Sequence, residues 1–311
     1  LGVVRARNAR NITIRGRGIL AATFLPGDPI PAAAAQCMMC LCGSNHAIDI
    51  EDSSDVQIEG ITVVHSTSWN VRLVGIRDGV VSGIKVIGWR CWNDGIDIAS
   101  SQRVRIERVF IRSDDDAIAI KGLDPNMDTA NVSVVDSVLW NQRFGNCMEV
   151  GFELNNARVR NISFERIVCF HETGSVMSIH NGGRAAVDGI SYTDISAQTV
   201  SSSMARGCRG NGCLMLFDFS IESDGKYCRR SAGCTDPWAR GSIRNVRLSN
   251  IRVATNGEPY IFSQMLGNSS AHDVSHIGFE RFTVDGAEAR SLRDLNATLN
   301  AFASDVTFGE D

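Results

Sequence analysis

The chain has 311 residues, of which 43% are hydrophobic and 21% are charged, an ordinary composition for a globular protein. A net charge of −4 gives no excess of basic residues, so we expect no nucleic-acid partner. No apolar run approaches the roughly 20 residues that cross a bilayer, so we expect no membrane partner either.

The first residues, "LGVVRARNARNITIRGRGIL", alternate apolar and polar positions and are interrupted by arginines, unlike a signal peptide. Such alternation is typical of strands in the middle of a fold. The segment therefore predicts that an N-terminal portion of the protein precedes residue 1.

A strand-like pattern then recurs along the chain. It reads "VQIEGITV" at 56, "VVSGIKVI" at 80, "VRIERVFI" at 104, "VSVVDSVL" at 132, "VRNISFERI" at 159, "VDGISYTDI" at 187, "IRNVRLSNI" at 243 and "VSHIGFERF" at 274. Equivalent apolar residues are 23 apart between Ile61 and Ile84 and 31 apart between Ile251 and Phe282. The interval of 56 between Ile195 and Ile251 is interpreted as two turns, one of them degenerate.

A second short strand precedes most of these segments. It reads "AIDI" at 47, "GIDI" at 95, "AIAI" at 117, "MEVG" at 148, "MSIH" at 177, "LMLF" at 214 and "YIFS" at 260. Leucine-rich repeats would need a Leu/Asn consensus, and propeller blades would repeat at 40 residues or more. Short strands at this spacing predict an all-β fold, a single-stranded right-handed parallel β-helix of roughly ten rungs. We expect one domain over residues 1–311, with loops projecting at about 21–46 and 201–240.

Ten cysteines are many for a cytosolic protein of this length. They are Cys37, Cys40, Cys42, Cys91, Cys147, Cys169, Cys208, Cys213, Cys228 and Cys234. A zinc site at "CMMCLC" is an alternative, but disulfides that close loops are favoured because no matching Cys/His pair follows. Five N-x-S/T sequons, at Asn11, Asn131, Asn161, Asn268 and Asn296, also favour a secreted glycoprotein.

The segment "SDDDAIAIKG" (113–122) places three carboxylates directly before a buried strand. Aligning the inward residues Ile96 and Ile118 of neighbouring rungs puts Asp94 and Asp116 at the same register, with Asp115 beside them. Asp114 is interpreted as a solvated or loop-capping neighbour. One face is expected to carry Asp94, Asp97, Asp115, Asp116, Lys121, Glu149, Glu153 and His180, with Trp89, Trp92 and Trp140 close by.

Paired carboxylates on adjacent rungs are the groups that hydrolyse a glycosidic bond. One carboxyl stays protonated and donates to the leaving oxygen, and crowding by like charges raises its pKa. The other is ionised and activates water. Tryptophan faces beside such acids suit stacking against a sugar. The pattern predicts a polysaccharide or oligosaccharide substrate and implies no cofactor and no metal.

The segments "NDGIDI" (93–98) and "DDDAIAIK" (114–121) resemble the polygalacturonase signature of glycoside hydrolase family 28. With "MEVGFELNNARVRNISFERIVCFH" (148–171), they are also similar to family 49, which contains dextranases and isopullulanase. Both families are right-handed β-helices of the pectin-lyase-fold clan that cleave α-linked polysaccharides with inversion. The resemblance implies that Asp115 is the general acid and that Asp94 and Asp116 activate water. Asp97, Lys121, Glu149, Glu153, His180 and Trp92 are then expected to bind substrate.

Two elements of family 28 are absent from the sequence. Its Gly-His-Gly corresponds to Gly145, Asn146 and Cys147, and its uronate-binding Arg-x-Lys falls at "VMSIH" (176–180), which has neither Arg nor Lys. A galacturonan would lack its charge partner there. A neutral α-glycan is therefore favoured over pectin.

Two other classes of function fit the same repeats. A glycan-binding or structural extracellular β-helix would need the fold but no catalytic acids. A polysaccharide lyase or epimerase would need a Lys or Arg base, and Lys121 is the single such residue expected on the acidic face.

Overall fold

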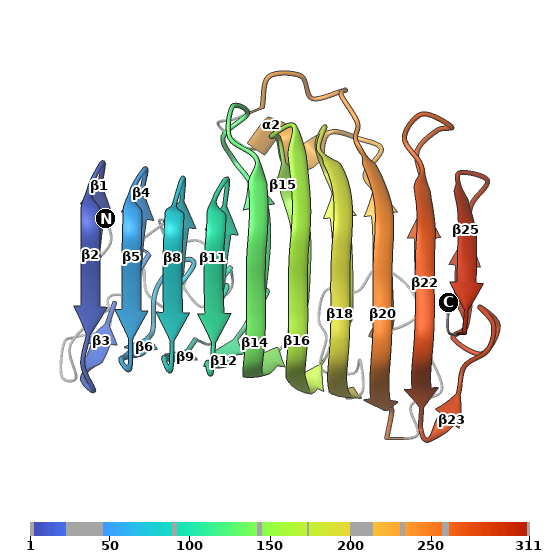
Figure 1. Cartoon of the computed structure of the whole chain (residues 1–311), viewed down its shortest axis with the longest axis horizontal. Helices are drawn as coiled ribbons and strands as arrows, with labels where there is room; N and C mark the ends of the chain where they lie inside the picture. The colour runs from blue at the N-terminus through green and yellow to red at the C-terminus, as the bar shows by residue number, and fades with distance from the viewer. Residues whose placement is uncertain are drawn as a thin grey trace, which may run out of the picture.

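The computed structural model describes residues 3–22, 46–88, 92–141, 145–172, 174–199, 214–230, 234–256 and 261–309. Most of the expected loop at 21–46 lies outside these ranges, as do residues 201–213 and 231–233 of the other expected loop, Trp89 and the cysteines at positions 37, 40, 42, 91, 208 and 213. Within them, short strands stack side by side into an elongated rod, with early strands at one end and late strands at the other (Figure 1).

One strand from each turn contributes to a ten-stranded sheet whose neighbours all pair in parallel. Its strands, in spatial order, are β1 (Val4–Arg7), β4 (Ile48–Glu51), β7 (Val71–Val74), β10 (Ile96–Ala99), β13 (Ile118–Gly122), β15 (Met148–Leu154), β17 (Ser175–Asn181), β19 (Leu214–Ile221), β21 (Ile261–Leu266) and β24 (Ala297–Leu299). We call this the first sheet. Its ten strands confirm the expected number of rungs.

The remaining strands form the opposite wall, which we call the second wall. They are β2 (Arg10–Arg15), β5 (Ser54–Glu59), β8 (Arg77–Ser82), β11 (Gln102–Glu107), β14 (Thr129–Asn141), β16 (Arg158–Glu172), β18 (Ala186–Thr199), β20 (Ser242–Ala254), β22 (Val274–Val284) and β25 (Ala303–Phe308), with the antiparallel β23 (Ala287–Glu288) at one edge. Four short strands, β3 (Ile19–Ala21), β6 (Thr62–Val64), β9 (Lys85–Ile87) and β12 (Phe110–Ser113), extend it in the early rungs. From β14 onward one long strand covers both positions, because β14 pairs with both β11 and β12.

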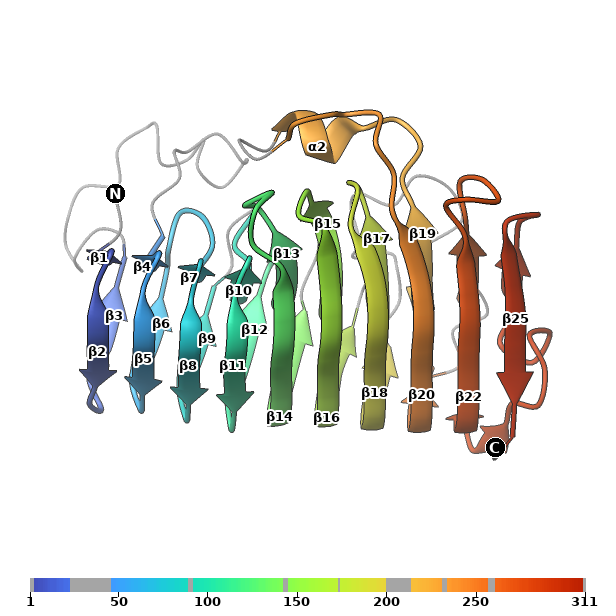
Figure 2. The same cartoon turned by 45° about the horizontal axis from the view of Figure 1, so that its top comes forward.

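The interval of 56 residues is a single rung, which corrects the expected degenerate turn. Ile195 of β18 pairs directly with Ile251 of β20. The intervening chain contributes β19 to the first sheet and the short helix α2 (Lys226–Arg230), which lies above the strand ends (Figure 2). The expected loop at about 201–240 therefore contains a strand and a helix.

Stacked aliphatic and aromatic side chains fill the rod. Ile48, Val71, Ile96 and Ile118 are fully buried and are register partners on successive strands of the first sheet. Further along, the same position is taken by Met148, Met177 and Phe217. Burying one such side chain contributes about 1.5–3 kcal/mol, so repetition on every rung stabilises the stack.

Residues with a left-handed backbone conformation recur at equivalent positions on successive strands of the second wall. Its members are Asn11, Asp55, Asp78, Arg103, Asn131, Asn161, Asn245, His276 and Asp305, with φ between +53° and +64°. Asn and Asp tolerate this region better than other non-glycine residues, which accounts for their recurrence just before the buried strand residues. No helix in the described ranges is long and apolar enough to span a bilayer.

Candidate active site

Strand register brings the acids of two rungs together. Ile96 of β10 pairs with Ile118 of β13, so Asp94 and Asp116, each two residues earlier, occupy equivalent places. The Gly95 amide donates to the Asp116 carbonyl oxygen at 2.8 Å, which ties the two leading edges to each other. The exposed fractions of Asp94 and Asp116 are 3% and 4%. The predicted adjacency of the two aspartates is therefore present.

Lys121 lies in the middle of the acid cluster. Its Nζ is 3.1 Å from Glu153 Oε2 and 3.7 Å from both Asp94 Oδ2 and Asp97 Oδ1. The Trp69 ring lies 4.8 Å from the same ammonium group, at cation–π distance. Burial lowers the pKa of Lys121, but the surrounding carboxylates outweigh it and raise the pKa well above its usual value. Lys121 is therefore a buried cation already paired by the protein.

The carboxyl groups hold protons more tightly than ordinary aspartates. Burial, followed by the charges of neighbouring carboxylates, raises the pKa of Asp94 and Asp116 well above the usual 3.8. Burial also raises the pKa of Asp115 to about 6 and that of Asp97 to about 7, with Lys121 acting in the opposite direction. The cluster can therefore contain both a protonated acid and an ionised base in the mildly acidic range.

A cleft of about 740 Å³ lies over these groups. The acid cluster contributes Asp94, Asp115, Asp116, Lys121 and Glu153 to its lining, and aromatic rings are contributed by Trp69, Trp92, Phe152 and Tyr227. Trp92 is 56% exposed. Trp140 lies elsewhere: its strand partner is Arg112 of β12, its ring packs edge-on against Phe170, and it is not among the lining residues. Acids flanked by aromatic faces are suited to a sugar chain.

Three of the predicted substrate-binding residues lie beneath the cleft. Asp97 and Glu149 are fully buried, His180 is nearly so, and none of the three is among the lining residues. The structure places these three residues close to the acid cluster, but their side chains do not line the cleft. In contrast, Lys121, Glu153 and Trp92 do reach the lining.

A buried polar chain extends from the cluster into the following rungs. Asn146 donates to Asp116 Oδ1 from its backbone amide at 2.7 Å and from Nδ2 at 3.2 Å. The same Nδ2 donates to Glu149 Oε2 at 2.9 Å. Nδ1 of His180 lies 2.9 Å from that oxygen, and its Nε2 lies 3.1 Å from Asp218 Oδ2. We call Asp116, Asn146, Glu149, His180 and Asp218 the buried network.

An aromatic stack closes over the buried network. The Phe152 ring stacks on His180 with centroids 4.2 Å apart, and Tyr227 of α2 stacks on its other face at 4.3 Å. Phe152 and Tyr227 line the cleft, whereas His180 remains below. The helix α2 therefore supplies one wall of the site.

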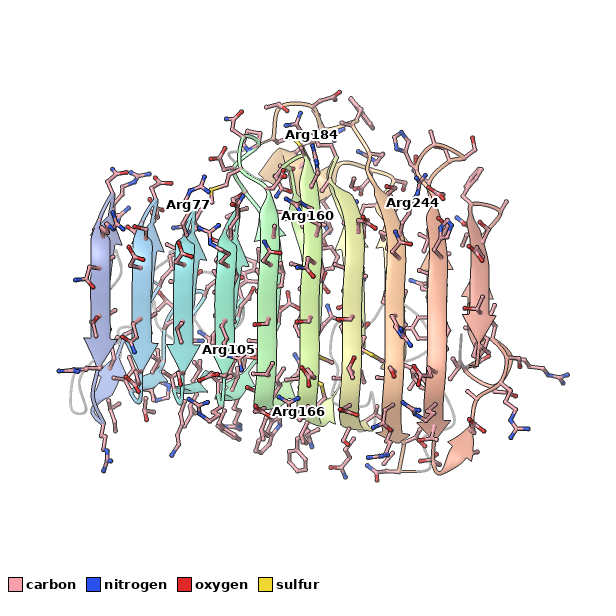
Figure 3. All side chains as sticks on the ribbon, in the orientation of Figure 1. Arg77, Arg105, Arg160, Arg166, Arg184 and Arg244 are labelled. Atoms are coloured by element: carbon pink, nitrogen blue, oxygen red, sulfur yellow. A yellow bond between two sulfur atoms is a disulfide. The ribbon has the colours of Figure 1, made fainter. Side chains whose placement is uncertain are left out.

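The two arginines that line the cleft, Arg7 and Arg72, are also paired, Arg7 with Glu51 at 2.9 Å. Arg72 forms ion pairs with Asp49, at 2.6 Å, and with Glu51. Arg184 donates to the backbone carbonyl oxygens of Asn155 and Pro125, at 2.9 Å and 3.1 Å. It lies at the upper ends of the strands, on the side of α2 (Figure 3). No group of three or more His, Cys, Asp or Glu in the described ranges is arranged to hold a metal ion.

Sequence reasoning missed four residues that shape the site: Trp69, Phe152, Asp218 and Tyr227. Asp218 follows "LMLF", and the alternation of that strand would have placed it outward in the register of Ser178, its observed partner. Tyr227 gave no such signal, because it lies on a short helix between rungs. Asn146 was interpreted as a departure from a motif, and its bonds to Asp116 were not anticipated.

Comparison with solved structures gives the fold. An exopolygalacturonase from Thermotoga maritima superposes with a TM-score of 0.68 and 15% identity, over 99% of this chain and 72% of that one. A polygalacturonase from Erwinia carotovora gives 0.67 and 13%, over 100% and 72%. The chain has the right-handed parallel β-helix of the polygalacturonases. Dex49A from Penicillium minioluteum shares this fold, with a TM-score of 0.58 and 12% identity over 98% of the chain and 51% of Dex49A.

Sequence comparison gives a shorter match to the same class of protein. A probable polygalacturonase from Vitis vinifera is 38% identical over 78 residues, which make up 24% of this chain and 16% of that relative. No family model matches the chain. The expected resemblance to the pectin-lyase-fold clan is thus confirmed.

Proposed function

We propose that the chain is an inverting glycoside hydrolase that cleaves α-glycosidic bonds in a polysaccharide or oligosaccharide. The observation that carries this proposal is the convergence of Asp94, Asp115 and Asp116, from two adjacent rungs, on one aromatic-lined cleft. Burial raises the pKa of all three carboxyls, which allows one of them to hold a proton while another is ionised.

The hydrogen bonds favour Asp115 as the general acid. Asp116 Oδ1 accepts two bonds from Asn146, and donors of this kind stabilise the ionised form of a carboxyl. Asp94 lies beside the Lys121 ammonium, which has the same effect. Among the described residues, the Asp115 carboxylate accepts one bond, from the Asp116 amide at 3.0 Å. Burial raises the pKa of all three carboxyls, so the choice of Asp115 rests on the partners of the three groups and not on their pKa values. Asp115 then protonates the glycosidic oxygen, while Asp116 and Asp94 deprotonate and orient the attacking water.

A neutral α-glycan is the substrate class that the charges favour. Lys121 is paired with Glu153, Asp94 and Asp97, and Arg72 is paired with Asp49 and Glu51. Arg7, which also lines the cleft, is paired with Glu51 and Asp52. To bind one of these described cations, a uronate carboxylate would have to displace an internal partner, and it would face the acid cluster at short range. The hydroxyl groups and C–H faces of a neutral sugar meet carboxylates and aromatic rings without that cost.

Secretion is part of the proposal. Disulfides join Cys147 to Cys169 and Cys228 to Cys234, which fits an oxidising compartment.

The test is hydrolysis of a panel that contains dextran, pullulan, starch and polygalacturonic acid, assayed by release of reducing ends and by the anomer formed. We expect wild type to hydrolyse a neutral α-glucan and to release the inverted anomer, and Asp115→Asn to lose this activity. If wild type and Asp115→Asn are equally inactive on every polymer but still bind one, the chain is a glycan-binding protein. Faster cleavage of polygalacturonic acid than of the glucans would overturn the neutral preference.

A further inference from the structure

We propose that Asn146, Glu149 and His180 are positioning residues that orient Asp116 and set its ionisation from inside the rod. This inference rests on the proposed function, since it gives Asp116 the role of base. It assigns to Glu149 and His180 an indirect role in place of the sugar contact that the sequence suggested.

The orientation of the Asn146 amide is fixed by its own partners. Its Oδ1 accepts a hydrogen bond from the Ser175 backbone amide at 3.0 Å, so Nδ2 must face the opposite way. The two hydrogens of Nδ2 are then directed at Asp116 Oδ1 and Glu149 Oε2. Asn146 therefore links the two carboxylates and holds Oδ1 of Asp116, which leaves Oδ2 for the cleft.

The protons of the other members follow from their contacts. Glu149 Oε2 accepts from Asn146, from the Ser178 hydroxyl and from His180, so Glu149 is ionised. His180 has a carboxylate at each ring nitrogen, so both nitrogens carry hydrogen and the ring is an imidazolium. Burial lowers the pKa of His180, but Glu149 and Asp218 outweigh it and raise the pKa well above its usual value.

Asp218 anchors the far end of the network. Its carboxylate accepts hydrogen bonds from the Ser220 hydroxyl and from Gln264 Nε2, the latter at 2.9 Å. Burial raises the pKa of Asp218, but His180 and these donors lower it below the usual value. The imidazolium is thus held between two fixed carboxylates and cannot rotate away without breaking both contacts.

Asp116 is affected by charge as well as by geometry. With Glu149 and Asp218 ionised and His180 protonated, the three groups carry a net charge of −1 next to it. Burial raises the pKa of Asp116 most, and the charges of Asp115 and Glu149 raise it further, whereas Lys121 and the bond from Asn146 lower it. Asp94 faces Asp116 from the adjacent rung and Lys121 faces it from β13. Changing the network should therefore move the titration of Asp116 in a direction that depends on the residue changed.

The experiment measures that titration directly, so that it does not depend on activity. Protein with carbon-13 in the aspartate carboxyl groups is titrated by NMR, and the Asp116 signal is assigned by its loss in Asp116→Asn. Glu149→Gln removes a nearby negative charge, and we expect the pKa of Asp116 to fall by about one unit. Asn146→Ala removes a donor to Oδ1, and we expect the pKa to rise by a similar amount.

Asn181→Ala is the matched control for Asn146→Ala. Asn181 is also fully buried and donates to a backbone carbonyl, that of Ala185 at 2.7 Å, but it has no bond to Asp116. It should weaken folding to a similar degree and leave the Asp116 titration unchanged. If Asn146→Ala does not fold, Asp218→Asn tests the opposite end of the buried network. This change removes one carboxylate partner of His180, so the imidazolium interacts more strongly with Glu149. We then expect the pKa of Asp116 to fall.

The outcomes separate this inference from the proposed function. If the titration of Asp116 is the same in wild type, Glu149→Gln, Asn146→Ala and Asp218→Asn, the network does not set its ionisation and the inference is overturned. If the titration shifts as expected while no glycan is hydrolysed, the network is supported and the hydrolase proposal fails. If the enzyme is active, the acid limb of kcat/KM should move with the NMR pKa in each variant.

Discussion

Asp94 and Asp116 occupy equivalent positions on adjacent rungs, each two residues before an isoleucine that is fully buried in the core. The stacking of Ile96 on Ile118 therefore fixes the distance between two carboxyl groups of the proposed active site. The carboxyl groups are placed by a repeat that also buries the core. The aromatic walls around them come from Trp69 and Trp92 between strands, from Phe152 of β15 and from Tyr227 of α2.

Asp115→Asn should abolish most of the hydrolytic activity. General acid catalysis contributes about 10²–10⁴-fold to rate, and asparagine keeps the shape of aspartate while removing its transferable proton. The measurement is kcat/KM on the best neutral α-glucan, compared with Asp78→Asn on the outer face of the second wall, where Asp78 pairs with Arg103. An Asp115→Asn rate within threefold of wild type would exclude Asp115 as the acid.

The pH dependence of activity follows from the protonated acid. Because the pKa of Asp115 is raised to about 6, kcat/KM should decline as the pH rises above about 6, when the acid loses its proton. Lys121 lowers that pKa, so Lys121→Met should move the alkaline limb to higher pH even if the maximal rate falls. A limb that moves to lower pH in Lys121→Met would contradict the assignment.

Asp97 should make the protein less stable as the pH rises. Its pKa is about 7 in the fold against 3.8 ordinarily, so the folded state binds more protons than the unfolded state between these values. The stability due to the protonated form is present below pH 4 and is lost as the pH rises to about 7. The shift of about three units sets an upper limit of about 4 kcal/mol.

Asp97→Asn should remove much of this slope. Both oxygens of Asp97 are buried without a hydrogen-bond partner among the described residues, although Lys121 lies 3.7 Å away, so an amide of the same shape can replace it. Tm measured from pH 4 to 8 should fall less steeply in the variant than in wild type. Asp136→Asn serves as the control, because Arg166 lowers the pKa of Asp136 and its effect lies at acidic pH. Equal slopes in wild type and Asp97→Asn would refute the prediction.

The sequence was sufficient for the parts of the site that repeat. Alternation placed Ile96 and Ile118 inward, and the register of Asp94 with Asp116 followed from that. Tyr227 could not be placed, because it stacks on Phe152 from a helix whose position depends on a long excursion between β19 and β20. The interval before Ile251 was misread for the same reason: spacing alone does not separate a missing repeat from an insertion.

Phe152 and Tyr227 should contribute to substrate binding more than to the chemical step. Their stacked rings line the cleft beside the acid cluster, and stacking of this kind is worth about 0.5–1.5 kcal/mol. Tyr227→Ala should therefore raise KM by up to about tenfold with little change in kcat. Phe170→Ala is the matched control, because Phe170 is 42% exposed on β16 and is not among the cleft residues. A change confined to kcat would instead place Tyr227 in the chemical step.

The disulfide between Cys147 and Cys169 should matter more than the one between Cys228 and Cys234. The first closes 22 residues and the second closes 6, so chain entropy predicts about 3 kcal/mol and about 2 kcal/mol respectively. Cys147 also follows Asn146 directly in the chain and is fully buried. Cys147→Ala/Cys169→Ala should therefore lower Tm by more than Cys228→Ala/Cys234→Ala and should also reduce kcat, because the support of Asn146 is loosened. The comparison is made by calorimetry and by glucan hydrolysis at a temperature where both variants are folded. A larger loss of Tm in Cys228→Ala/Cys234→Ala would contradict this prediction. It would show that the disulfide beside α2 contributes more to stability than the one next to Asn146.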